Sequence, residues 1–288
     1  MWILLISVIP LIDAFGNLFN KKASKQGIDP LIISWANNIL VVLLVLPLIF
    51  FVDLRITSGY IKALCVTGTI NVFATIMYMR AVSKGDISEI IPMLSFTPLF
   101  MLITSPIIVG ELPKPGGIAG ILLVVLGSYL LNINLRSRDL LAPIAALYKN
   151  SGTRLMLIVS FLFSITSNFD KVAVNYSSPM QHLLFLNLYV FAGVSIVMMA
   201  SRKFSHSQLS AGRYNLFILS LLNLAGSLLF LFAITYTYVA YVISLKRTSG
   251  MLSVLLGHYF LKEPNIRERI LGSVIMFIGV ILILFTRS

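Results

Sequence analysis

The chain has 288 residues, of which 58% are hydrophobic and 11% are charged, and its formal net charge is +12. A soluble domain carries about 25% charged residues, so this composition excludes an ordinary soluble protein and indicates that lipid covers most of the surface. The basic residues lie in ones and twos between apolar runs. This pattern favours the flanks of membrane spans over a nucleic-acid-binding face. The single cysteine, Cys65, excludes an internal disulfide, a cysteine-based zinc site and dithiol redox chemistry.

Charges, prolines and glycines divide the chain into apolar stretches of roughly the 20 residues that a membrane-crossing helix needs. In chain order the predicted spans are 2–20, 29–52, 60–80, 86–109 and 115–134, then 153–176, 180–201, 212–236, 239–261 and 266–286. We therefore predict an all-α integral membrane protein with ten transmembrane helices. Residues 135–152 form a polar connector, in which Leu140–Leu147 indicates a short interfacial helix.

The second half of the chain repeats the first. At a shift of 152 residues, 71–134 align with 223–286 without a gap, and at a shift of 150, Phe19–Ala23 align with Phe169–Ala173. The aligned pairs include Asn71 with Asn223, Ala81 with Ala233, Glu111 with Glu263, Gly120 with Gly272 and Gly127 with Gly279. The sequence therefore predicts two five-helix repeats, 1–134 and 153–288, joined by the connector.

Five spans in each repeat determine how the two copies sit in the membrane. An odd number of crossings makes the second copy enter the membrane in the opposite orientation. Inverted repeats are common in secondary transporters, whose substrate site lies near the midplane where the halves meet. A duplication that only provides a stable helix bundle is the alternative.

The ends of the two repeats carry a family resemblance. Each repeat closes on an apolar span, a glutamate and a last helix with spaced glycines. The matching stretches are Ile87–Leu131, around Val109-Gly110-Glu111-Leu112, and Val239–Leu284, around Leu261-Lys262-Glu263-Pro264. With its ten spans, the chain resembles the EamA-type drug/metabolite transporter superfamily over essentially its whole length. The resemblance implies a central cavity lined mainly by the first, third and fourth helices of each half.

Two adjacent cations in the ninth span, Lys246 and Arg247, are the first candidates for substrate binding. Arg247 lies about 12 Å into this span from Val239, at roughly 1.5 Å per residue. A charge at the bilayer centre costs about 2.5–3.5 kcal/mol on insertion scales. Arginine offers a rigid fork for phosphate or carboxylate and lysine a mobile point charge. Thr248 and Ser249 add hydroxyl groups on the same turn.

The duplication indicates that the fold itself does not need these cations, because the aligned residues of the first repeat are Leu94 and Ser95. Two explanations therefore stay open for Lys246 and Arg247. They bind an anionic ligand, or they form an internal ion pair with Asp13 or Asp170. Asp13, inside the first span, is also a candidate for carrying a coupling proton.

Lys171 in the sixth span is a further candidate cation. It lies near the end of its span and beside Asp170, so snorkelling to the membrane surface or neutralisation by Asp170 are alternatives. A lysine in the sixth helix with a Lys-Arg pair in the ninth resembles the triose-phosphate translocators, a branch of the same superfamily. The resemblance implies that Lys171, Lys246 and Arg247 hold an anionic group, with Lys21 or Lys22 as a candidate pseudo-symmetric partner.

Amide and phenol side chains inside the spans are candidates for contacts to the polar groups of a substrate. These residues are Asn17, Asn71, Tyr78, Asn168 and Asn223. Hydrogen bonds between helices are the alternative role for the amides, and a place at the membrane interface is the alternative for Tyr78. Glu111 and Glu263, at span ends, are expected to bond to helix ends or loops.

The chain carries no recognised motif of an enzyme or of a nucleotide-binding loop, and its three histidines are isolated in sequence. We therefore predict no catalysis, no cofactor and no metal site. We predict a secondary transporter in the cytoplasmic membrane that moves a small polar, anionic metabolite by alternating access, with a coupling ion or counter-substrate. Two alternatives stay open: an exporter of amino acids, amines or drug-like solutes, and a non-transporting membrane scaffold or sensor.

The orientation in the membrane has two conflicting predictions. Apart from Lys171, Lys246 and Arg247, fifteen basic residues follow odd-numbered spans and four follow even-numbered ones. By the positive-inside rule this distribution places both termini outside the cytoplasm. The family resemblance implies that both termini lie in the cytoplasm.

Overall fold

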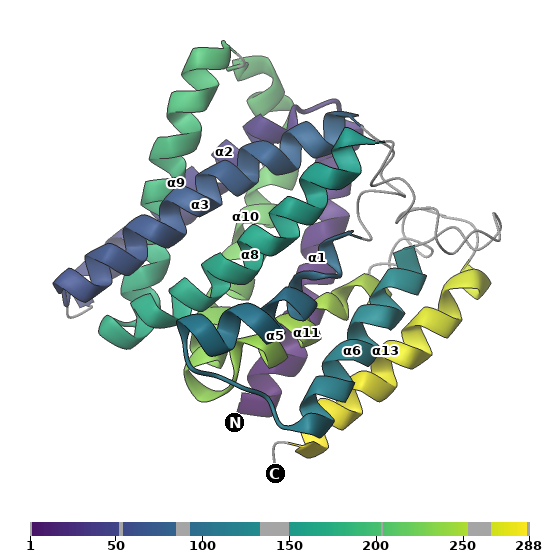
Figure 1. Cartoon of the computed structure of the whole chain (residues 1–288). Coiled ribbons are helices and arrows are strands. Elements are labelled where there is room, and N and C mark those ends of the chain that lie inside the picture. Colours follow the sequence, from purple (N-terminus) through teal and green to yellow (C-terminus); the bar gives the residue numbers. More distant parts are fainter. Residues whose placement is uncertain are drawn as a thin grey trace.

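The computed structural model describes residues 2–51, 54–84, 93–132, 150–202, 204–252 and 266–286. These residues form ten α-helices and one 3-10 helix and contain no strand, which confirms the predicted all-α class. The first repeat contains α1 (Trp2–Lys25), α2 (Pro30–Val45), η1 (Leu46–Phe51), α3 (Ser58–Lys84), α5 (Thr97–Ile108) and α6 (Pro115–Asn132) (Figure 1). The second contains α8 (Ser151–Tyr176), α9 (Pro179–Ser201), α10 (His206–Tyr236), α11 (Val239–Arg247) and α13 (Ile266–Thr286).

The start of the second helix is built in the same way in both repeats. The Asp29 side chain accepts a 2.8 Å hydrogen bond from the amide of Leu31 at the start of α2, which begins with a proline. At the start of α9 the Ser178 hydroxyl accepts a 3.2 Å bond from the amide of Gln181, and Pro179 is the first helical residue. A side-chain cap followed by proline is a strong signal for a helix start, because proline has no amide hydrogen to leave unsatisfied.

The helix bounds agree with most predicted spans, and α13 has the predicted bounds 266–286. The span expected at 29–52 is instead an α-helix that ends at Val45 and continues as the 3-10 helix η1. Pro47 explains this change because it cannot donate an α-helical hydrogen bond. The predicted interfacial helix at 140–147, and parts of the spans 86–109 and 239–261, lie outside the described residues.

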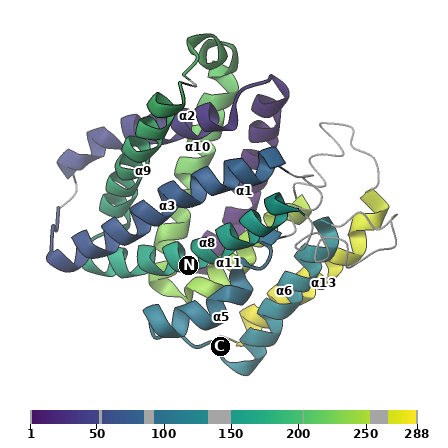
Figure 2. The ribbon, with the colours of Figure 1, turned by 45° about the horizontal axis from the view of Figure 1, so that its top comes forward.

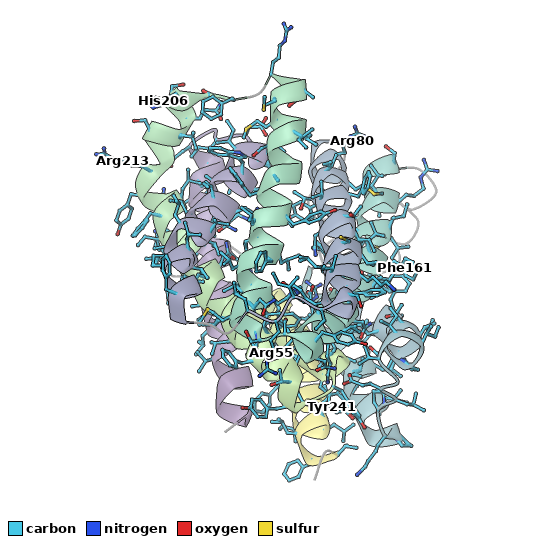
Figure 3. The ribbon with its side chains drawn as sticks, turned by 90° about the vertical axis from the view of Figure 1, so that its left-hand side faces the viewer. Arg55, Arg80, Phe161, His206, Arg213 and Tyr241 are labelled. Carbon is cyan, nitrogen blue, oxygen red and sulfur yellow. The ribbon has the colours of Figure 1, made fainter. Side chains whose placement is uncertain are left out.

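The helices are long and apolar enough for a membrane protein. Four of them meet the length and hydropathy expected of a complete span, namely Ser58–Tyr78, Ser151–Tyr176, Pro179–Ser201 and His206–Tyr236, and four shorter helices are also apolar. Large hydrophobic side chains are exposed on the outside, with Ile107 and Met199 each 78% exposed. Arg80, His206 and Arg213 lie toward one end of the molecule, and Arg55 and Tyr241 lie toward the other (Figure 3).

The contact between α6 and α13 shows that the two repeats are inverted. A Cβ atom added to Gly120 would lie 2.8 Å from the carbonyl oxygen of Gly279, and one added to Gly127 would lie 2.6 Å from that of Gly272. In sequence, however, Gly120 aligns with Gly272 and Gly127 with Gly279. The two equivalent helices therefore run antiparallel, side by side, with their backbones in close contact (Figures 1 and 2).

We expect a methyl group at this contact to destabilise the protein. In Gly279→Ala the new Cβ would lie 2.7 Å from the Gly120 carbonyl oxygen and 2.8 Å from the Val124 nitrogen. Overpacking of this kind costs about 1–3 kcal/mol. The apparent melting temperature in detergent should fall for Gly279→Ala but not for Gly16→Ala, whose Cβ would have nothing within 4 Å. Equal melting temperatures for Gly279→Ala and the unmodified protein would contradict the close approach.

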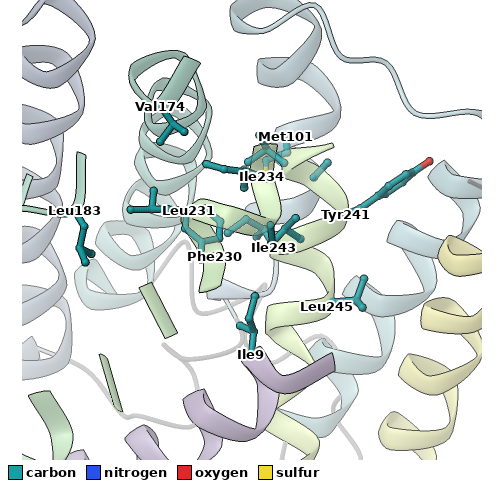
Figure 4. Close-up of a cluster of buried hydrophobic side chains, with 14 of the residues drawn as sticks. Ile9, Met101, Val174, Leu183, Phe230, Leu231, Ile234, Tyr241, Ile243 and Leu245 are labelled. Carbon is teal, nitrogen blue, oxygen red and sulfur yellow. The ribbon is translucent and has the colours of Figure 1, made fainter. Parts of the chain in front are cut away.

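Helices of one repeat pack mainly against helices of the other. α3 packs on α8 and α1 packs on α10, so the third helix of each repeat lies against the first helix of its partner, and α2 packs on α9. The largest buried cluster draws on both repeats, with Ile9 of α1, Met101 of α5, Val174 of α8 and Leu245 of α11 (Figure 4). This packing of one repeat against the other places α11, which ends in the two cations, between α1, α5 and α6.

Candidate substrate site

Arg247 ends the short helix α11, in which all residues from Val239 to Leu245 are buried. Its Nη2 donates a 2.8 Å hydrogen bond to the Thr97 hydroxyl at the start of α5. That hydroxyl lies 3.0 Å from the hydroxyl of Ser160 on α8. The Nε of Arg247 is buried and has no hydrogen-bond partner among the described residues. A guanidinium group has five N–H donors, so a neutral hydroxyl satisfies only a small part of this one.

Lys246, the neighbouring cation, faces α1. Its Nζ lies 3.7 Å from Oδ2 of Asp13 and 5.6 Å from the centroid of the Phe230 ring. The expected ion pair with Asp13 is therefore formed by Lys246, whereas Asp170 bonds elsewhere. The Lys246 side chain is 35% exposed, and the Oδ2 atom of Asp13 is buried without a hydrogen-bond donor among the described residues.

The charges of this cluster do not cancel. Lys246 and Arg247 contribute two positive charges and Asp13 contributes one negative charge, which leaves a net charge of +1. Asp13 and Tyr78 both lie within electrostatic range of the Arg247 guanidinium. No other described carboxylate lies within salt-bridge distance of either cation. The described residues therefore leave a partly buried net positive charge at Lys246 and Arg247, against which Asp13 is the one described carboxylate.

A line of small polar side chains joins α5 to α8. The Thr97 hydroxyl meets that of Ser160, and the Ser105 hydroxyl donates a 2.8 Å bond to the Asn168 side-chain oxygen. Asn168 in turn donates a 3.0 Å bond to the Thr104 hydroxyl. Hydrogen bonds of this type connect transmembrane helices because lipid offers polar groups no other partner. This polar seam starts at Arg247 and follows the two helices toward Lys171.

Lys171 lies at the far end of the polar seam. Its Nζ bonds to the Glu111 carboxylate and donates a 2.9 Å bond to the Thr237 carbonyl, and the same carboxylate accepts a 2.9 Å bond from the first amide of α11. Lys171 and Glu111 line a pocket of about 340 Å³ with Lys114, Tyr236, Tyr238 and Tyr241. Glu111 therefore acts as the predicted partner of a helix end.

The structure does not bring Lys171 together with the other two cations. Ser160, which lies beside the Arg247 site, is eleven residues from Lys171 on α8, a distance of about 16 Å at 1.5 Å per residue. Thr97 and Glu111 are separated by the whole length of α5 in the same way. The three cations implied by the resemblance to triose-phosphate translocators form two separate sites in this conformation.

The chain also matches known proteins. The model of the EamA-like transporter family matches residues 1–133 and 150–285. The chain belongs to the EamA-like transporter family. It is thus a multi-pass membrane protein from a family of transporters of small solutes, as the sequence predicted.

Solved structures support this family fold. A protein of known crystal structure shares 14% sequence identity with this EamA-like chain and aligns with a TM-score of 0.77, over 100% of this chain and 98% of that one. In total, 28 chains of solved structures match. A search of curated protein sequences gave no match. At this identity the similarity establishes the fold alone.

The remaining predicted contact residues of this EamA-like chain are spread over several helices. Asn71 donates to the carbonyl and hydroxyl of Thr67 within α3, and Asn223 donates a 2.9 Å bond to Asn37 on α2.

The other predicted contact residues lie apart from these two. Asn17 is exposed, Asn168 belongs to the polar seam, and the Thr248 hydroxyl bonds to the Leu245 carbonyl one turn back. Ser249 is buried beside this turn, and Tyr78 lies within electrostatic range of Arg247. Lys22, the candidate pseudo-symmetric cation, lies over the Phe19 ring at 4.9 Å.

Sequence reasoning missed the hydroxyl groups of the polar seam, of which Thr97 bonds to Arg247. Thr97, Thr104 and Ser105 lie on one helix, and Ser160 and Ser164 lie on another. Their spacing of about one or two helical turns was the available signal, because residues three or four apart share a face of a helix. Serines and threonines that recur at this spacing on each of two spans predict that the two helices contact each other there.

We expect the Lys171–Glu111 pair to be important for stability. The two side chains are only 12% and 10% exposed, and breaking a buried ion pair by removing one partner costs about 3–5 kcal/mol. Glu111→Gln should lower the apparent melting temperature. The double variant Glu111→Gln with Lys171→Met should recover part of the loss, because it removes the unpaired charge. A double variant as unstable as the sum of the two single variants would contradict the pairing.

Proposed function

We propose that this protein is a secondary transporter that carries a small anionic metabolite, either phosphorylated or carboxylated, across the cytoplasmic membrane by alternating access. The observation that carries this proposal is the state of Arg247. Its guanidinium is in the interior, one donor bonds to a neutral hydroxyl, and Nε has no partner among the described residues. A buried unsatisfied donor costs about 1–3 kcal/mol, more for a charged group, so its presence favours a ligand that accepts these bonds.

The charge of the site favours an anionic ligand. A phosphate or carboxylate would neutralise the net positive charge that Lys246, Arg247 and Asp13 leave in the interior. The planar fork of Arg247 can bond to two oxygens of such a group at once, and the partly exposed Lys246 can turn from Asp13 to the ligand. The resemblance to triose-phosphate translocators supports the same anionic class through the positions of these two cations.

Lys171 is proposed to meet the substrate at a different point on its path. The pocket beside Lys171 also contains Lys114 and three tyrosines, so it offers positive charge at one end of the protein. Phosphate or carboxylate would compete there with Glu111. The other predicted contacts, Asn17, Asn71, Tyr78, Asn168, Asn223, Thr248 and Ser249, are proposed to orient the polar groups of the substrate in one or another conformation.

The inverted repeats support alternating access. The polar seam joins α5 of the first repeat to α8 of the second. Hydrogen bonds between membrane helices average about 0.6 kcal/mol, so such a seam can open and close again at low cost. Because the sequence has no recognised nucleotide-binding loop, transport would be driven by a coupling ion or a counter-substrate.

One observation favours a second candidate, an exporter of amino acids or other amines. The Oδ2 atom of Asp13 is buried without a hydrogen-bond donor among the described residues, and an ammonium group could bind there in place of Lys246. The positive net charge of the cluster makes this the weaker of the two proposals.

Exchange across a liposome membrane tests the proposed function. Purified protein is reconstituted into liposomes loaded with inorganic phosphate, a sugar phosphate or a dicarboxylate, and the uptake of the same labelled anion is compared with protein-free liposomes. The proposal predicts exchange for at least one of these anions and none for labelled amines. Exchange of amines alone would support the second candidate. The absence of flux for both anions and amines would contradict both transport proposals.

A further inference from the structure

Asp170 and His182 form a second buried pair of ionisable groups, outside the proposed substrate site. The His182 side chain is completely buried, and Asp170 is 8% exposed. The Nε2 atom of His182 lies 3.2 Å from Oδ1 of Asp170, and the Thr67 hydroxyl donates a 2.6 Å bond to the same oxygen. The three residues come from α9, α8 and α3. Ionisable groups inside a membrane protein are costly and mark ion pathways or proton relays.

The imidazole ring of His182 is only half satisfied. Its Nδ1 atom is buried and has no hydrogen-bond partner among the described residues. In the neutral ring one nitrogen is a donor and the other an acceptor, and in the charged ring both are donors. Whichever form is present, Nδ1 lacks a partner among the residues that the structure describes. A buried group that stays unsatisfied in a native structure calls for an explanation, and a proton-transfer role supplies one.

The equivalent position of the other repeat contains no such pair. In an inverted duplication, the contact of α8, α9 and α3 corresponds to the contact of α1, α2 and α10. The repeat shifts of 150 and 152 place Asp170 on Asn20 and Thr67 on Leu219, and the first prolines of α2 and α9 place His182 on Ile33. The same helix contact therefore forms without a titratable group, so the fold does not require Asp170 or His182.

The surroundings offer Asp170 no other cation among the described residues. α3 contributes Tyr60, whose ring centroid lies 6.1 Å from that of His182, and Lys62, which is exposed. The segment before α3 contributes Arg55, whose backbone bonds to Gln181 of α9 through 2.9 Å contacts.

The other charged or titratable groups on the elements packed against α8 and α9 are bonded elsewhere or exposed. Lys171 of α8 bonds to Glu111, which follows α5. Arg247 of α11 bonds to Thr97, and Lys246 is paired with Asp13 of α1. Tyr176 at the end of α8, Tyr236 at the end of α10, and His206, Arg213 and Tyr214 near its start are exposed. A proton on the pair is therefore the neutralising charge that the described residues leave for the Asp170 carboxylate.

We propose that Asp170 and His182 bind one proton and form the coupling-ion site of the transporter, an inference that rests on the proposed secondary transport. The proton adds to the ring or to the carboxylate, and in both cases the net charge of the pair changes from −1 to zero. A neutral pair is cheaper to bury than an anionic one. Proton binding therefore stabilises the conformation described here, and proton loss favours a conformation in which water reaches Asp170.

The position of the pair connects it with the proposed path of the substrate. Asp170 directly precedes Lys171 on α8, and residues adjacent on a helix point about 100° apart. One side chain faces α3 and α9, and the other bonds to Glu111 and to the carbonyl of Thr237 between α10 and α11. A shift of this end of α8 on proton loss would therefore also move the pocket that contains Lys171.

Uptake of labelled inorganic phosphate into proteoliposomes tests the proposal. Exchange without a pH gradient is measured first, and then net uptake with a gradient of one pH unit in either direction. For one proton per anion, we expect a gradient of one pH unit to change the steady-state ratio of labelled phosphate inside to outside the liposomes by about tenfold in the unmodified protein. Asp170→Asn and His182→Gln should keep exchange but lose this response. His206→Gln, at the exposed start of α10, is the matched control and should keep both.

Three results would overturn the proposal: exchange without any gradient response in the unmodified protein, a full response in both variants, or loss of exchange together with the response in both. If the unmodified protein does not exchange inorganic phosphate, a sugar phosphate or a dicarboxylate replaces it as the labelled anion. If none of these anions exchanges, the proposed function is wrong, and the melting temperature between about pH 5 and 8 then tests the proton site alone. A pH dependence that disappears in Asp170→Asn would support the site. Identical curves for variant and unmodified protein would contradict it.

Discussion

Arg247→Gln is expected to abolish anion exchange and leave the protein folded. Glutamine keeps one donor for Thr97 but loses the charge and the fork that would hold a phosphate or carboxylate. Hydrogen bonds to charged groups contribute about 1.5–3 kcal/mol each, so the loss of two would weaken anion binding by a hundredfold or more. The measurement is exchange of labelled anion in proteoliposomes, and Lys246→Gln should show a smaller loss.

The stability of the same variant separates a binding role from a structural one. Arg247 has no described carboxylate in salt-bridge distance, so its removal takes away a partly buried charge without breaking an ion pair. We therefore expect an unchanged or higher melting temperature for Arg247→Gln without ligand. Arg154→Gln, an exposed change at the start of α8, is the control and should affect neither property. Full exchange in both Arg247→Gln and Lys246→Gln would refute the anion site.

Asp13→Asn is expected to strengthen anion binding and to slow turnover. Asp13 lies 3.7 Å from the Lys246 ammonium, so its carboxylate competes with an anionic substrate for that cation. The amide would remove this competition, and a gain of about 1.4 kcal/mol corresponds to tenfold tighter binding. A substrate held more tightly in the site is released more slowly. The apparent affinity of the variant should therefore rise, seen as a lower Kd, while its maximal exchange rate falls.

The same substitution distinguishes the two transport proposals. In an exporter of amines, Asp13 would itself bind the substrate, and Asp13→Asn would abolish transport while Lys246→Gln preserved it. Lys62→Gln, an exposed change on α3, controls for the general loss of charge. Weaker anion binding in Asp13→Asn would contradict the competition between Asp13 and the substrate.

The sequence allowed the helices and their inverted arrangement to be predicted because both depend on features that repeat along the chain. Apolar stretches of sufficient length locate most spans, and the alignment of Gly120 with Gly272 indicates equivalent helices. The structure adds that Gly120 contacts Gly279, which aligns in sequence with Gly127. Antiparallel packing of equivalent helices requires such a crossed contact. Sequence alone could not provide this contact, because it depends on where the two helices cross.

The candidate site was harder to predict, because the position of a residue along its helix and the direction of its side chain decide which side chains meet. Lys171 lies on the predicted helix, but its partner Glu111 is sixty residues away and holds it at the opposite end of α5 from Arg247. An ion pair of Asp13 with Lys246 or Arg247 was one of the alternatives that the sequence left open, and the structure forms this pair with Lys246.

The Asp170–His182 pair shows how a signal in the sequence can be overlooked. The two residues are twelve positions apart, six before the end of α8 and three after the first residue of α9. Only a short turn separates these helices, so residues within the two helical turns on either side of it lie close together. A histidine that is isolated in sequence can therefore have a carboxylate partner across such a turn.

Ligand-dependent thermal stability of the purified protein tests most directly whether the interior binds an anion. The melting temperature is measured with sugar phosphates, carboxylates, inorganic phosphate, amino acids, amines and nucleobases. A ligand that binds only the folded protein stabilises it by about 2.7 kcal/mol at roughly a hundred times its Kd. We predict an increase confined to anions and lost in Arg247→Gln. An increase with amines or neutral solutes alone, or an anion effect that persists in Arg247→Gln, would contradict an anion site at Arg247.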